Sequence, residues 1–84
     1  MDDAELRRRA RERMEAGTLP SNRPLRRIRD MGTGEHCDLC DLPIQRIEVE
    51  ELVEIREGQV LRVVRFHLRC ASVWTIERAQ ERGE

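Results

Sequence analysis

Two closely spaced pairs of cysteine and histidine residues constrain this chain of 84 residues more than any other feature of its sequence. Cys37 and Cys40 stand two residues apart in "EHCDLCDLPI", and His67 and Cys70 repeat that gap in "RFHLRCASVW" after twenty-six intervening residues. A gap of this length lets both side chains of a pair point at one ion from a tight turn or a helix end. Four such ligands suit a tetrahedral site. The pattern therefore predicts one metal site made of Cys37, Cys40, His67 and Cys70.

The composition favours a metal over a disulfide as the element that helps to hold the fold. Charged residues make up 39% of the chain, and its aromatic residues are Phe66 and Trp74. Chains this short bury a small core and often need a metal, a disulfide or a partner. Three cysteines do not suit a disulfide framework, and neither a secretory signal nor a membrane span is expected. We therefore expect a cytoplasmic protein. In the reducing cytoplasm, paired cysteines bind metal more often than they form disulfides.

The donor set favours one structural Zn²⁺, with iron as the alternative metal. The competing interpretation is three buried apolar cysteines and one core histidine, which two matching pairs on either side of a hairpin disfavour. Four protein ligands close the zinc shell, whereas a catalytic zinc keeps a position for water. The order of the pairs is also the reverse of that in zinc deaminases, and no general base stands out. We therefore expect a non-enzymatic protein with no small-molecule substrate.

The N-terminal third is expected to form a helix followed by a loop. Residues 2–16 carry apolar side chains at every fourth position, which predicts a helix with a thin apolar stripe, and Gly17 is a natural stop. Prolines and glycines punctuate residues 17–34, which predicts a loop. Three apolar side chains are expected to pin one turn of this loop to the core: Leu25, Ile28 and Met31.

The remaining residues predict a hairpin and a final helix. Residues 47–55 alternate between apolar and acidic side chains, residues 56–59 are typical of a turn, and residues 60–66 read as a second strand. From Leu68 to about Arg82 the pattern predicts a helix, with Cys70 in its first turn. The expected fold class is α+β, with an N-terminal segment at 1–34 and a zinc-binding domain at 35–84.

The segment "CDLCDLPI…RFHLRCASVW" resembles a treble-clef zinc finger, in which a zinc knuckle, a β-hairpin and a C-terminal helix share one ion. More narrowly, it is similar to the zinc finger of poly(ADP-ribose) polymerases, which has Cys-x2-Cys, a slightly longer gap and His-x2-Cys. Aromatic residues stand before the histidine and after the last cysteine in that family, as Phe66 and Trp74 do here. The chain also resembles small uncharacterised bacterial proteins with the same layout. The resemblance covers residues 35–78 and implies a zinc module without polymerase activity.

The charge distribution suggests two kinds of partner. Residues 4–29 hold nine arginines and three glutamates, whereas residues 30–57 hold nine acidic residues and two arginines. Two oppositely charged surfaces favour an adaptor that binds another protein. The alternative is nucleic-acid binding, with candidate contacts at Arg23, Arg26, Arg27 and Arg29. Arginine suits phosphate contacts, but the pI of about 6.1 is far below that of a basic nucleic-acid footprint.

Overall fold

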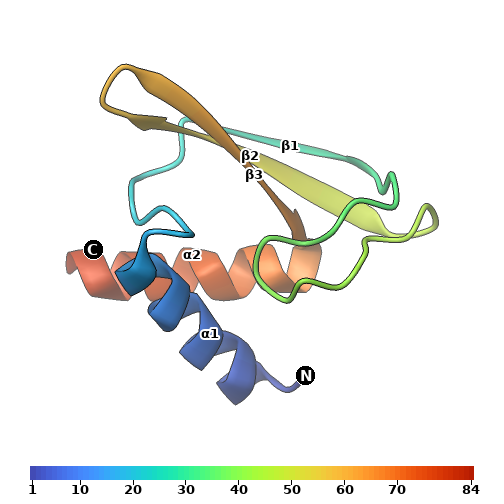
Figure 1. Cartoon of the computed structure of the whole chain (residues 1–84), viewed down its shortest axis with the longest axis horizontal. Coiled ribbons are helices and arrows are strands. Elements are labelled where there is room, and N and C mark those ends of the chain that lie inside the picture. Colours follow the sequence, from blue (N-terminus) through green and yellow to red (C-terminus); the bar gives the residue numbers. More distant parts are fainter.

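A computed structural model describes all 84 residues as a small α+β fold with two helices and a three-stranded antiparallel sheet. The sheet has the strand order β1-β2-β3, and both helices lie on the same side of it (Figure 1). No helix has the length and apolar character that a membrane span requires. In chain order the elements are α1 (Asp3–Ala16), β1 (Arg26–Met31), β2 (Val49–Glu57), β3 (Val60–His67) and α2 (Leu68–Arg82).

Helix α1 confirms the helix expected near the N-terminus. The Asp2 side chain caps it by accepting a hydrogen bond of 2.9 Å from the Glu5 N–H, and Gly17 ends it in the left-handed conformation. The predicted stripe is buried and joins one continuous hydrophobic core that includes residues of both β-strands of the hairpin and of α2. The buried stripe residues are Leu6, Ala10 and Met14.

Strand β1 corrects the prediction that residues 17–34 form only a loop. Its sequence, "RRIRDM", has no apolar alternation, because five of its six side chains are exposed at the sheet edge. Pairing with β2 stabilises it instead, and the register sets Arg26 opposite Glu54 and Arg29 opposite Glu51. The prediction that three apolar side chains anchor this segment in the core is also wrong, since Leu25 and Met31 are exposed and only Ile28 is partly buried.

The β2–β3 hairpin is present, although its first strand begins two residues later than expected. Ile47 lies outside the strand and is 84% exposed. The strand pair Glu57–Val60 closes a two-residue turn, and Gly58 supplies the positive φ that this turn requires. Val53 and Ile55 are buried on the face toward the helices, as the alternation predicts. Glu51 lies on that same face and is also buried.

Helix α2 has the predicted bounds and carries the central aromatic residue of the core. Trp74 is fully buried and stacks on Phe66 of β3, with 5.4 Å between the ring centroids. Its indole N–H donates a hydrogen bond of 2.8 Å to the Pro20 carbonyl, which ties the segment after α1 to the core. The sheet, both helices and this segment therefore share one packed interior.

The segment that follows β1 passes very close to the segment that precedes β2. A Cβ atom added to Gly32 would lie 2.2 Å from the Gln45 carbonyl oxygen and 2.8 Å from that of Ile44. The Gly32 N–H donates to the Glu48 carbonyl at 2.7 Å, and the Gly34 N–H donates to the Ile44 carbonyl at 2.9 Å. This close contact holds together the two ends of the loop, residues 33–48, that carries the first cysteine pair.

Candidate metal centre

The first cysteine pair lies in a tight turn, residues 37–41, which we call the knuckle. The Asp41 N–H donates to the Cys37 carbonyl at 3.0 Å, and the Leu39 N–H points at the Cys37 sulfur at 3.4 Å. Leu39 is fully buried and anchors the turn in the core. Backbone bonds thus turn the chain so that the sulfurs of Cys37 and Cys40 face the same point.

The knuckle is docked on the outer edge of β3 by Asp38. The Asp38 N–H donates to the Arg65 carbonyl at 2.8 Å, and the Asp38 carboxylate accepts from the Arg65 N–H at 2.7 Å. Since Arg65 is two residues before His67, this docking places the first ligand pair beside the second.

Asp41, directly after the second cysteine, is the one non-glycine residue of the chain with positive φ, at 67°. Two arginines of α1 hold its carboxylate: Arg13 with contacts of 3.0 and 2.5 Å, and Arg9 with one of 3.2 Å. Arg13 also donates to the Asp38 carbonyl at 2.9 Å. The hydrogen bonds from Arg13 lower the pKa of Asp41, so the carboxylate is charged at neutral pH. Helix α1 therefore binds the knuckle through side chains that are not candidate metal ligands.

The second pair lies where β3 passes into α2. His67 is the last residue of β3, and Cys70 lies in the first turn of α2. The His67 Nδ1 atom lies 3.4 Å from the Cys40 sulfur, and Nε2 lies 3.3 Å from the Pro43 carbonyl oxygen. The ring therefore turns Nδ1 toward the sulfurs, while Nε2–H donates to the carbonyl and fixes the tautomer that leaves Nδ1 free to bind.

All four sequence-predicted ligands come together. One ligand atom from each of Cys37, Cys40, His67 and Cys70 lies within 4.8 Å of the other three. A tetrahedral site with metal–sulfur bonds of about 2.3 Å sets its sulfurs roughly 3.8 Å apart, so small shifts close the cluster on one ion. The three cysteines are buried and free of disulfides. The chemistry and geometry of this donor set fit a single metal ion.

The three cysteines of the metal-free cluster differ in pKa. A hydrogen bond from the Cys70 thiol, helped by backbone N–H groups, lowers the pKa of Cys37. The same hydrogen bond, together with burial, raises the pKa of Cys70, and burial raises the pKa of Cys40. One sulfur is therefore a thiolate before metal binds, and a metal must displace protons from the other two.

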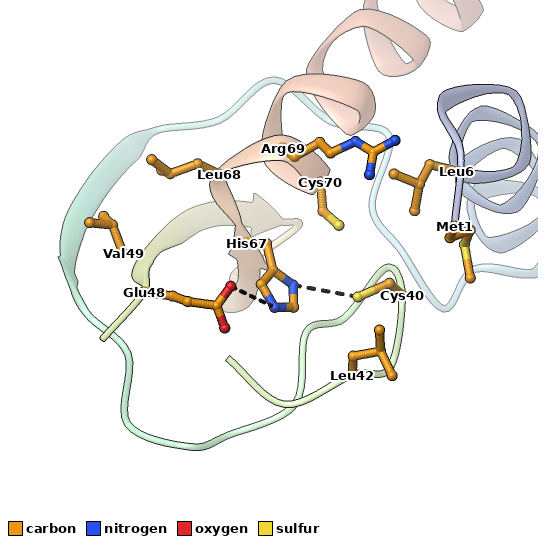
Figure 2. A pocket seen from close by; sticks show the side chains of 10 residues that line it. All are labelled: Met1, Leu6, Cys40, Leu42, Glu48, Val49, His67, Leu68, Arg69 and Cys70. Atoms are coloured by element: carbon orange, nitrogen blue, oxygen red, sulfur yellow. Dashed lines mark hydrogen bonds and ion pairs between the residues drawn. The ribbon is translucent and has the colours of Figure 1, made fainter. Parts of the chain in front are cut away.

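A pocket of about 430 Å³ opens beside this centre (Figure 2). Cys40, His67 and Cys70 line it, whereas Cys37 does not. Much of the remaining lining is apolar and includes four exposed side chains: Met1, Leu42, Val49 and Leu68. The pocket thus reaches the centre on the side of Cys40, His67 and Cys70, whereas Cys37 is buried away from it.

The candidate nucleic-acid contacts do not form a free basic patch. Each of the four arginines lies in an ion pair with a glutamate. Arg27 and Arg29 hold the buried Glu51 at 2.8 and 3.0 Å, and Arg27 also lies 5.8 Å from the centre of the Trp74 ring. The other two pairs are Arg23–Glu84 at 3.1 Å and Arg26–Glu54 at 3.7 Å.

No sequence pattern predicted the residues that support the ligands. Arg9 and Arg13 lie 32 and 28 positions before Asp41, and no local spacing rule links such distant residues. The Pro43 carbonyl is a backbone group, so the type of residue at that position does not predict its contact with His67. Comparison with known proteins adds nothing here: no protein family, curated protein or solved structure matches the chain.

Proposed function

We propose that this chain is a non-enzymatic zinc-binding module in which one structural Zn²⁺ holds the knuckle to the start of α2. The observation that carries this proposal is the cluster of three cysteine sulfurs and one imidazole nitrogen within 4.8 Å. Three thiolates and one imidazole favour zinc over hard cations such as magnesium or calcium. Four protein ligands also fill a tetrahedral shell, which supports a structural role over a catalytic one.

Substitution of Co²⁺ for Zn²⁺ tests whether four protein ligands bind the ion and whether the site is structural. Protein refolded with Co²⁺ should show the intense visible bands of tetrahedral coordination and a thiolate-to-metal charge-transfer band, at one equivalent of metal. The Cys70→Ser variant should weaken that band, while His36→Ala, which changes an exposed neighbour of Cys37, should leave it unchanged. A spectrum that shows a bound water or a five-coordinate ion would contradict the structural assignment.

The order of elements supports a treble-clef-like arrangement. The knuckle comes first, the β2–β3 hairpin follows, and α2 then supplies the last ligand. In this proposal the metal joins the two ends of the hairpin unit, and α1 and β1 are additions packed around it. An experimental structure with metal bound tests the assignment through the position of the ion between these elements.

We further propose that the module serves as an adaptor that binds another protein. Exposed large apolar side chains gather at the rim of the pocket beside the metal centre. Nucleic-acid binding is the weaker candidate, because the arginines proposed for it are engaged with glutamates. Phosphate contacts would have to compete with these ion pairs.

Capture from native lysate, with and without nuclease treatment, separates the two candidates. Proteins retained equally in both samples would support the adaptor. Loss after nuclease treatment, with binding to a DNA fragment that falls steeply with salt, would favour nucleic acid. In that case the variant Arg23→Gln/Arg26→Gln should bind DNA more weakly, whereas Arg7→Gln, at an exposed position of α1, should bind as wild type does.

A further inference from the structure

Strand β3 is one edge of the sheet, and its first half is apolar and open. Leu61 is 55% exposed and Val63 is 53% exposed. Both alternate with the buried Val64 and Phe66, which places them on the sheet face away from the helices. On this face Arg56 of β2 lies opposite Leu61 and Glu54 lies opposite Val63, so the open apolar surface is confined to β3. An apolar edge of this kind is a template for another strand, and monomeric proteins commonly block it.

The backbone of this edge points away from the sheet at alternate residues. Both the N–H and the carbonyl of Arg65 bond outward to Asp38. Because the direction alternates along an antiparallel strand, the same groups of Val63 and Leu61 also point outward. Neither residue forms a backbone hydrogen bond to any turn or loop of the chain. Two donors and two acceptors are thus left for a partner.

The two edges of the sheet differ in chemistry. The β1 edge carries a run of charged side chains, "RRIRD", which resists pairing with another strand. The open part of β3, "VLRV", has one charged residue, and its Arg62 guanidinium folds back onto the Gly17 and Thr18 carbonyls. The strand has neither lysine nor proline. The β3 edge is therefore the one suited to a strand partner.

The knuckle limits the register that such a partner can take. It occupies the outer edge at Arg65, so only the part of β3 before that residue is free. A second copy of this chain satisfies that limit if the two strands run antiparallel with Leu61 opposite its own counterpart. Each knuckle then lies beyond the hairpin turn of the other copy, and Val63 meets the other copy near Gln59.

We propose that two copies of this chain pair through their β3 edges, with the two-fold axis at Leu61, to form one continuous antiparallel sheet. The outward backbone groups of Leu61 bond to those of the other Leu61, and the two exposed Leu61 side chains lie side by side at the axis. This surface is separate from the metal centre, and the proposal goes beyond the zinc adaptor.

Sedimentation of the metal-loaded protein across a concentration series tests this pairing. The wild type should move from the mass of one chain, 9.9 kDa, to twice that value as the concentration rises. Leu61→Lys and Leu61→Glu should each stay monomeric, because equal charges meet at the axis. An equimolar mixture of the two variants should recover the dimer, because opposite charges then face each other.

Ile76→Lys is the matched control, since Ile76 is 51% exposed on α2 and lies away from the edge. It should dimerise as the wild type does, and all variants should keep one equivalent of metal and the wild-type melt. The proposal is overturned if the wild type stays monomeric up to about 1 mM. It is also overturned if both charged variants still dimerise, or if their mixture stays monomeric.

Discussion

Arg13 of α1 holds Asp41 of the knuckle through two contacts, of 3.0 and 2.5 Å, across 28 positions of sequence. Neither residue is a candidate metal ligand, yet Asp41 follows Cys40 directly and has a backbone conformation that favours glycine. The arginine therefore holds in place a turn that would otherwise tend to relax. The N-terminal helix in this way supports the candidate metal centre from outside its ligand set.

We predict that Arg13→Gln lowers zinc affinity about 10-fold to 100-fold, the range typical of residues that orient ligands from outside the coordination shell. Asp41→Asn should have a similar effect, and the double variant should lose less affinity than the two single losses combined, because both variants remove the Arg13–Asp41 contact. Competition with a chromophoric chelator measures the affinities. Arg7→Gln, at an exposed position of α1, is the control, and equal losses for Arg7→Gln and Arg13→Gln would refute a specific role.

Removal of the metal should unfold the protein. Structural zinc contributes on the order of 10 kcal/mol or more of binding energy, and this binding is coupled to folding in a chain with so small a core. We expect a strong chelator to abolish the cooperative thermal transition seen by circular dichroism. His67→Ala should behave like chelated wild type, whereas His36→Ala should melt as wild type does. A cooperative melt that survives chelation at zero bound metal would rule out the structural role.

Metal affinity should fall as the pH is lowered. The pKa values of Cys40 and Cys70 are raised in the metal-free chain, so both thiols hold protons at neutral pH and must release them to bind metal. Two displaced protons correspond to an affinity change of roughly 100-fold per pH unit, with tighter binding at higher pH. Chelator competition at several values between about pH 6 and 8 measures this slope. An affinity that is constant over this range would contradict the proton assignment.

Gly32→Ala should destabilise the fold by a steric mechanism. Its Cβ would lie 2.2 Å from the Gln45 carbonyl oxygen, so the backbone must move. We expect a loss of stability of about 3 kcal/mol or more. Gly34→Ala has open space around its Cβ but a φ of +88°, which gives a smaller cost of about 1–2 kcal/mol. Urea unfolding of the two metal-loaded variants compares these costs. A smaller loss for Gly32→Ala than for Gly34→Ala would show that the two segments separate easily.

The sequence revealed those parts of the fold that depend on periodic or paired residues. Matching gaps in the two ligand pairs identified the cluster, and the alternation in residues 47–66 identified the hairpin. It did not reveal β1, because an edge strand with exposed arginines has no apolar pattern and owes its stability to β2. Long-range contacts such as that of Arg13 with Asp41 were also inaccessible, since they depend on how the finished elements pack.

Trp74 is the only tryptophan of a chain without tyrosine, and it lies fully buried one helical turn after Cys70. Its ring stacks on Phe66, the residue just before His67, so the fluorophore touches the segment that carries the second ligand pair. The protein therefore has a built-in optical reporter. Its emission will register ion capture and core assembly together, without any added label.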